Sequence, residues 1–263
     1  MAKKPPGLPQ PAPVQRLRLR YAKRGRLRFT SHRDIARAFE RALRRADVPM
    51  AYSSGFSPHP KVSWVGAAPT GVASEAEYVE IGLARIVDPE ALRRALDESL
   101  PVGLDVLEAV EAPVGTSLPD RVEASRWAIR LPGLALADVE SAVAAFVAAA
   151  EVPVERLTKD GVRRFDARGP VVRLVATDPG DGCATLLLVV RHVTPAVRPD
   201  DVLSALRAVA DLVPPVPPEA TRQAQGPLSA DGEVGDPLAP DRGHDPAGAT
   251  RQDADREQTV GGP

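Results

Sequence analysis

Sulfur and aromatic side chains are scarce in this sequence. Cys183 is the only cysteine among 263 residues, and Phe, Trp and Tyr make up 4% of the chain. A single cysteine excludes an internal disulfide, a cysteine-based zinc site and a three-cysteine iron–sulfur site. Because disulfides mark oxidising compartments, their exclusion favours a reducing one, and we expect a cytoplasmic protein.

Long apolar runs are also missing. No run approaches the roughly 20 residues that span a bilayer, so we expect no membrane partner. Residues 1–14 contain several prolines and no apolar segment, which predicts a short disordered arm and not a signal peptide. The motifs GxxxxGK[ST], GxGxxG after a strand, HExxH and CxxxCxxC are absent. Glu75, Glu77 and Glu80 cluster without a nearby His or Cys. We therefore predict no metal and no cofactor.

Charge is distributed unevenly along the chain. Residues 1–64 hold 15 Lys and Arg against three Asp and Glu, whereas residues 214–263 hold four Arg against nine acids. Arg outnumbers Lys by 29 to 5, so part of this excess reflects the coding bias of a GC-rich genome. The asymmetry indicates a basic surface for a polyanion near the N-terminus and an acidic tail.

Residues 214–263 contain nine Pro, seven Gly and no Phe, Trp or Tyr. Such a segment buries too little apolar surface to offset its ordering entropy, so we expect it to be disordered. It either competes with RNA or recruits a partner, or it is a solvated extension without a specific role.

The intervening residues predict an α+β fold of two tandem ferredoxin-like (split βαβ) domains. In the first, residues 15–111, apolar periodicity predicts helices over 31–47 and 88–100, and strands over 15–22, 50–54, 61–65, 77–83 and 104–109, with the alternation of the first strand resuming over 26–29 after a turn at 23–25. Residues 112–121 form a linker. In the second, residues 122–213, we expect helices over 136–150 and 199–212, and strands over 125–131, 153–158, 162–168, 171–177 and 184–193.

The helix at 31–47 carries the strongest functional signal. Arg33, Arg37, Arg41 and Arg45 recur every fourth residue, with Arg44 beside them, on the side opposite the apolar face. Like charges at this spacing repel, and a phosphate backbone would relieve that repulsion. The alternative is a solvated helix face enriched in Arg by coding bias. Arg28 and the other strand arginines add to the same basic segment.

Two histidines stand close to this helix in the sequence. His32 follows the N-cap residue Ser31 in a basic segment and is a candidate general base. His59 belongs to a Gly/Pro-rich loop in which Phe56 offers a stacking surface, and Ser57 and Lys61 offer phosphate contacts. The alternatives are a binding or structural histidine and an ordinary turn.

A second basic segment, residues 159–168, is predicted to form a hairpin. Lys159, Arg163 and Arg168 are candidates for a secondary RNA contact. A salt-bridged structural hairpin is an equal alternative.

Residues 26–34, 39–46, 52–61 and 71–78 together resemble a bacterial radical-SAM-linked family of unknown function, found alone or fused behind a radical SAM enzyme. The resemblance extends over about residues 14–213, and Arg33 departs from it where the family has an apolar residue. It implies a separately encoded radical SAM partner, with this chain as the accessory half.

These observations lead to three hypotheses. The first is an RNA-binding accessory protein in tRNA or rRNA modification, contacting RNA through Arg28, Ser31, His32, Arg37, Arg41, Arg44, Arg45, Phe56, Ser57, His59 and Lys61, with no DNA specificity. The second is a metal-independent RNA endonuclease that uses His32, by fold-level analogy. The third is a protein–protein adaptor.

Overall fold

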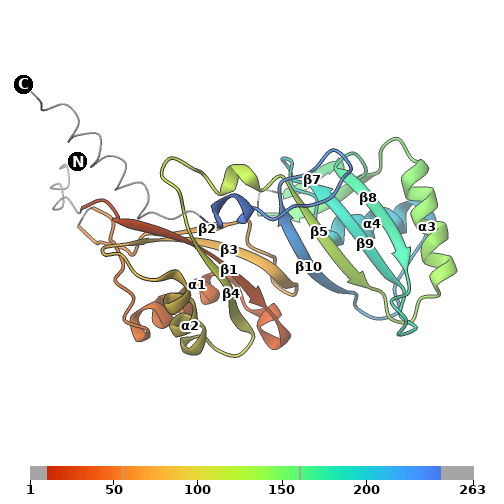
Figure 1. Cartoon of the computed structure of the whole chain (residues 1–263). Coiled ribbons are helices and arrows are strands. Elements are labelled where there is room, and N and C mark those ends of the chain that lie inside the picture. Colours follow the sequence, from red (N-terminus) through yellow and green to blue (C-terminus); the bar gives the residue numbers. More distant parts are fainter. Residues whose placement is uncertain (1–10, 55, 160, 244–263) are drawn as a thin grey trace, which may run out of the picture.

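The computed structural model describes residues 11–54, 56–159 and 161–243, and shows an α+β protein with one large mixed sheet (Figure 1). Its strands are β1 (Gln15–Lys23), β2 (Val62–Val65), β3 (Ala73–Leu83), β4 (Leu104–Glu111), β5 (Ala124–Arg130), β6 (Pro153–Thr158), β7 (Gly161–Asp166), β8 (Val171–Thr177), β9 (Thr185–Arg191) and β10 (Glu219–Gly226). The α-helices of the described part are α1 (His32–Arg45), α2 (Pro89–Ser99), α3 (Leu136–Ala148) and α4 (Pro199–Ala210).

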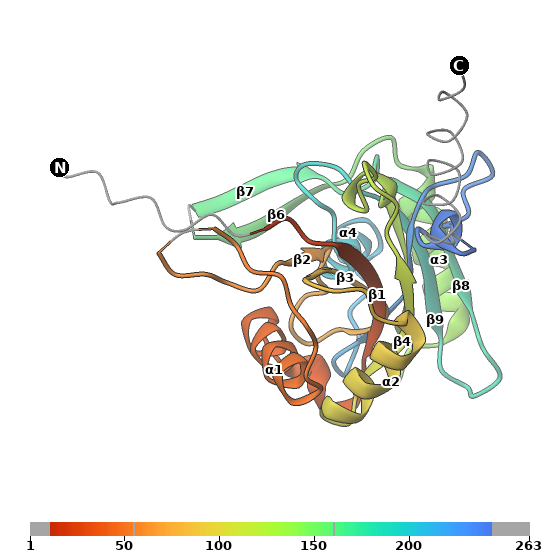
Figure 2. The same cartoon turned by 60° about the vertical axis from the view of Figure 1, so that its left-hand side comes forward.

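In the first half, α1 and α2 cover one face of strands β1–β4 (Figure 2). Strand β1 pairs antiparallel with β3 and β4, and β2 pairs antiparallel with β3, which gives the strand order β4-β1-β3-β2. Alternation along β1 turns Leu17, Leu19 and Tyr21 toward the two helices, where all three are buried. The β-α-β-β-α-β order expected for residues 15–111 is therefore present.

The second half repeats this arrangement with an inserted hairpin. Its strands follow the order β10-β5-β9-β8, each pair antiparallel, and α3 and α4 pack on one face through Phe146, Val202 and Leu206. Strands β6 and β7 form a separate two-stranded sheet that projects from the body of the protein (Figure 2).

A short parallel contact between β3 and β10 joins the halves into one sheet, with Thr221 opposite Ala73 and Arg222 opposite Ser74. The Arg222 side chain is buried at this junction. It forms an ion pair with Glu77, and its guanidinium lies 5.4 Å from the Trp127 ring centroid.

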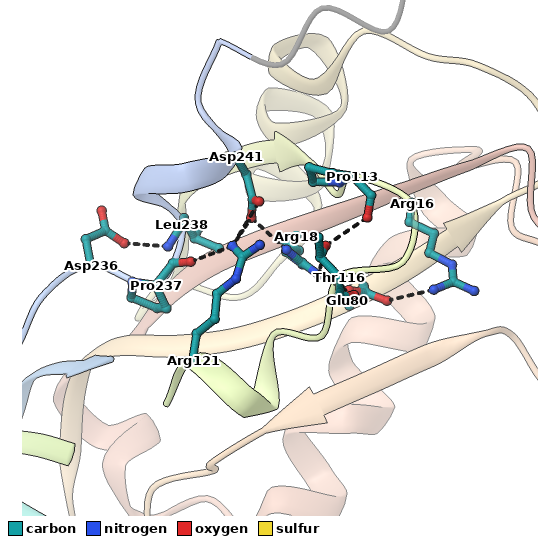
Figure 3. Close-up of polar contacts among 10 residues, drawn as sticks. All are labelled: Arg16, Arg18, Glu80, Pro113, Thr116, Arg121, Asp236, Pro237, Leu238 and Asp241. Atoms are coloured by element: carbon teal, nitrogen blue, oxygen red, sulfur yellow. Dashed lines mark hydrogen bonds and ion pairs between the residues drawn. The ribbon is translucent and has the colours of Figure 1, made fainter. Parts of the chain in front are cut away.

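The prediction that residues 214–263 are disordered is wrong up to Gly243. Strand β10 pairs with β5, and the following segment crosses the face of the first sheet that the helices leave open (Figure 3). There Asp241 accepts hydrogen bonds from Arg18 at 2.8 Å and from Arg121 at 2.9 Å, and all of its surface is buried except 2%. Polar contacts order this segment together with the buried side chains of Val234 and Leu238, so its lack of aromatic residues was misleading. Residues 244–263 lie outside the described part.

Other predictions differ from the structure in detail. Residues 25–29 form a 3₁₀-helix, η1 (Gly25–Phe29), where continued alternation predicted a strand. Residues 50–54 contribute isolated bridges at Met50 and Tyr52 and no full strand. The predicted linker at 112–121 is packed into the protein. Leu118 is fully buried and is the N-cap of a second 3₁₀-helix, η2 (Pro119–Arg121). Of the N-terminal arm, residues 1–10 lie outside the described part.

Candidate nucleic-acid interface

Helix α1 begins as the sequence predicts. Ser31 is the N-cap: its hydroxyl accepts a hydrogen bond from the backbone amide of Asp34 at 3.2 Å and donates one to the Asp34 carboxylate at 2.7 Å. Ile35, Phe39, Ala42 and Leu43 are buried against the sheet. Helical periodicity therefore turns the arginines on the other side toward solvent.

Most of these arginines lack an acidic partner. Arg33, Arg41 and Arg44 are exposed and form no ion pair with the residues that the structure describes. Arg37 lies 3.5 Å from the Asp34 carboxylate, at a strongly exposed site where such pairs are weak. Arg45 donates a hydrogen bond to the Ser99 carbonyl at the end of α2. We call these five residues the arginine stripe.

The arginines of β1 are not part of this surface. Arg18 is fully buried between Glu80 and Asp241, and Arg16 lies 3.8 Å from Glu80. Arg20 donates to the backbone carbonyl of Glu75. Acids and backbone carbonyls of the protein thus pair with the β1 arginines, which the sequence had predicted to add to the basic surface.

Arg28 precedes α1 and His32 is its first residue, and the two side chains lie in different surroundings. The Arg28 guanidinium is 4.8 Å from the centroid of the exposed Phe29 ring and 3.6 Å from the Glu219 carboxylate of β10. The exposed His32 ring stands perpendicular to the Trp64 ring at a centroid distance of 5.1 Å. Arg28 therefore links the halves, whereas His32 borders an aromatic cluster.

The loop at 53–61 is anchored at its base. The Ser53 amide donates to the His59 carbonyl at 2.8 Å, and the His59 amide donates to the Ser53 hydroxyl at 3.0 Å. Phe56 and Ser57 are exposed at the tip, and 74% of the Phe56 surface is accessible.

The loop residues do not all face α1. His59 borders a cavity beside α1, whereas Lys61 borders a different cavity with Arg16, Ser63 and Glu80. The structure therefore separates Lys61 from the arginine stripe. Alternation along this extended segment accounts for Lys61, because Pro60 and Trp64 at even positions line the cavity beside α1, whereas Lys61 and Ser63 at odd positions line the other one.

The predicted basic hairpin is β6–β7, which packs on α4 in the second half and not on α1 (Figure 1). Lys159 and Arg163 are exposed. Arg168 is instead structural, because it donates to the carbonyls of Val171 and Val147 and lies over the Phe146 ring.

Trp64 was missed by the sequence analysis although it is central to the aromatic cluster. Its half-buried ring contacts three other rings in nearly edge-to-face geometry. The centroid distances are 5.2 Å to Phe39, 5.1 Å to His32 and 5.9 Å to Tyr21. The available signal was a tryptophan, one of two in the chain, only three positions after the basic loop.

Other polar clusters of the described part lack the features of a reactive site. Among these residues no group of three or more His, Cys, Asp and Glu is placed to hold a metal, and no helix has the length and apolarity to cross a membrane. The Ser125 hydroxyl lies 2.7 Å from Nε2 of His192, and desolvation lowers the pKa of that imidazole. Ser125 is 1% exposed, however, and a nucleophile must reach its substrate.

Comparison with known families gives one decisive match. The model of a family described as "Uncharacterized protein conserved in bacteria (DUF2344)" matches residues 16–199. The chain belongs to this family. The DUF2344 match includes α1, the 53–61 loop and the β6–β7 hairpin, and it ends before β10.

No curated protein matches this DUF2344 chain. Similar solved structures include DyPB from Rhodococcus jostii RHA1, at 12% identity over 76% of this chain and 85% of that one, with a TM-score of 0.22. Another is a DyP-type peroxidase from Streptomyces coelicolor, at 12% identity over 92% and 96% of the two chains, with a TM-score of 0.22. Superpositions this poor carry no argument about fold or function.

Proposed function

We propose that this protein binds RNA through the arginine stripe of α1. One contrast carries the proposal. The arginines of β1 are satisfied by acids and carbonyls of the protein, whereas Arg33, Arg41 and Arg44 have no acidic partner among the described residues. Unpaired guanidinium groups in a row repel one another, and a phosphate backbone relieves that repulsion as counterions are released.

Exposed aromatic rings on η1 and on the 53–61 loop favour RNA as the polyanion. Phe29 is 60% exposed and Phe56 is 74% exposed, and unstacked bases of single-stranded RNA stack on such rings. The same chemistry accepts single-stranded DNA, and the proposal includes no specificity for DNA. Lys159 and Arg163 on the β6–β7 hairpin would supply a secondary contact, without Arg168.

The proposal assigns the protein an accessory role beside a separately encoded radical SAM enzyme in the cytoplasm. The resemblance to the radical-SAM-linked family supports this partnership. Cys183 is the only cysteine, so the thiolate ligands of an iron–sulfur cluster would come from the partner. The reaction would be a modification of tRNA or rRNA.

We also interpret each half as a ferredoxin-like unit. The strand orders β4-β1-β3-β2 and β10-β5-β9-β8 are equivalent once the β6–β7 hairpin is treated as an insertion, and two helices cover one face in each. On this interpretation the second unit runs to β10.

One observation favours a metal-independent endonuclease as the second candidate. His32 contacts Trp64, and His59 borders the same cavity as Trp64, so both imidazoles lie near one site. Cleavage of RNA in EDTA that His32→Ala abolishes would establish this function. RNA that stays intact through long incubation would contradict it.

Crosslinking followed by affinity purification tests the accessory role. We expect ultraviolet light to attach RNA to the chain in cells, and a radical SAM protein to co-purify. An adaptor predicts instead that protein partners survive nuclease treatment and that no RNA is crosslinked. That result would contradict the proposed function.

A further inference from the structure

A small cavity opens between α1 and β2, with a volume of about 120 Å³. Most of its lining residues have apolar side chains: Phe39 and Leu43 come from α1, and Pro60, Val62 and Trp64 come from the segment leading through β2. Two polar side chains, Glu40 and His59, also line it. This volume equals about four water molecules, which suits one flat ring better than a larger ligand.

The cavity lies beside the arginine stripe. Residues three or four positions apart are neighbours on a helix surface. Arg37 precedes the lining residue Glu40 by three positions, and Arg44 follows it by four. Arg33 likewise precedes the lining residue Ala36 by three. Three arginines of the stripe are therefore helix-surface neighbours of residues that line the cavity.

This arrangement matches the chemistry of one nucleotide. An aromatic and aliphatic slot accepts the face of a base, and cations at the rim accept its phosphates. The carboxylate of Glu40, one of the lining side chains, would accept hydrogen bonds from an exocyclic amino group. Adenine, cytosine and guanine carry such a group, whereas uracil does not.

We infer that this cavity holds a single unstacked base bearing an exocyclic amino group, from an RNA strand whose phosphates follow α1. The inference rests on the proposed function and deepens it by assigning a base-recognition site. Glu40 would select the base, and Trp64 would provide its stacking surface.

Fluorescence of Trp64 provides the test. The chain contains two tryptophans, and Trp127 is buried under Arg222, so a Trp127→Phe background isolates Trp64. We expect eight-nucleotide oligo(A) and oligo(C) to quench Trp64 and to bind about tenfold more tightly than oligo(U), because uracil has no exocyclic amino group to donate to Glu40.

Two variants separate the base site from the phosphate surface. Glu40→Gln on the exposed face of α1 should reduce the preference for oligo(A) and oligo(C) over oligo(U). Trp64→Leu should weaken binding of single strands about tenfold, whereas Trp64→Phe should retain most of it. Thermal unfolding followed by circular dichroism identifies any variant that fails to fold, and Glu40→Gln then decides alone.

The outcomes distinguish the two claims. RNA could bind in a salt-dependent manner while Trp64 stays unquenched and Glu40→Gln leaves the base preference unchanged. That result would overturn the base site and leave the phosphate surface intact. Absence of RNA binding at low salt would overturn the proposed function itself.

Discussion

Arg18 and Asp241 are 223 positions apart in the sequence, yet their side chains form an ion pair at 2.8 Å, and neither side chain has exposed surface. Arg121 completes the cluster on the other side of Asp241. The contact fixes the C-terminal segment across the first sheet (Figure 3). It also removes Arg18 from the charge available to a polyanion.

Loss of this ion pair should destabilise the protein strongly. Asp241→Ala removes one of the two carboxylates that pair with the buried guanidinium of Arg18, and the carboxylate that pairs with Arg121, so we expect the free energy of unfolding to fall by about 3–5 kcal/mol. Urea unfolding measures the change. Glu98→Ala, at an exposed position of α2, should stay within about 0.5 kcal/mol of the original protein. Equal losses in both variants would contradict the buried cluster.

Truncation tests the corrected domain boundary. A chain ending at Val213 loses β10 and with it the buried Arg222, so Glu77 loses its partner at the junction. We expect this chain to unfold at a clearly lower denaturant concentration or to aggregate. A chain ending at Gly243 keeps every contact described above and is the matched control. If the two chains were equally stable, β10 would not be part of the fold.

Gly226 should be intolerant of any side chain. A Cβ atom added there would lie 2.2 Å from the Gly235 carbonyl oxygen, so one backbone segment must move. We expect Gly226→Ala to cost about 1–3 kcal/mol in urea unfolding. Gln223→Ala, three positions earlier in β10, should change stability by less than about 0.5 kcal/mol. If Gly226→Ala left the free energy of unfolding unchanged, the C-terminal segment would not lie against β10.

The β6–β7 hairpin should contribute acid-sensitive stability through Asp166. Burial by itself raises the pKa of this carboxyl, but hydrogen bonds from the backbone amides of Val152, Arg168 and Gly169 outweigh burial and lower it. A lowered pKa gives stability that is present above the unfolded value near pH 4 and is lost as the pH falls through the folded value.

Asp166→Asn should therefore lower the free energy of unfolding near pH 7 by about 1–3 kcal/mol. On acidification from about pH 5 to about pH 2, the free energy of unfolding of this variant should fall by less than that of the original protein. Urea titrations across this range give both quantities, with Glu151→Gln as the exposed control. Parallel acid profiles for Asp166→Asn and the original protein would contradict the role of these hydrogen bonds.

Apolar periodicity was sufficient to locate most elements. Helix α1 was expected over residues 31–47 and is observed over His32–Arg45, because its apolar positions recur at helical spacing. Strand β10 has no such signal: its buried residues include Arg222 and Gln225, which are satisfied by Glu77 and by the Ala76 carbonyl. Partners so distant in sequence cannot be recognised from local pattern.

The candidate site, too, could be predicted only in part from the sequence. Spacing of four residues located the arginine stripe, because helix geometry alone places those residues together. The cavity lined by Trp64 and Glu40 depends on how β2 docks against α1, and the sequence contains no local sign of that contact. The pairing of Arg18 with Asp241 was hidden for the same reason.

The salt dependence of RNA binding tests the central claim most directly. Fluorescence anisotropy of an unstructured RNA would compare the original protein with Arg41→Gln/Arg44→Gln on α1, and with Arg191→Gln/Arg207→Gln at exposed positions of the second half. We expect affinity to fall steeply with salt, and the slope of log K against log salt to be shallower by about 1.4 in the α1 variant only. Absent binding at low salt, or equal slopes in all three proteins, would contradict RNA binding by the arginine stripe.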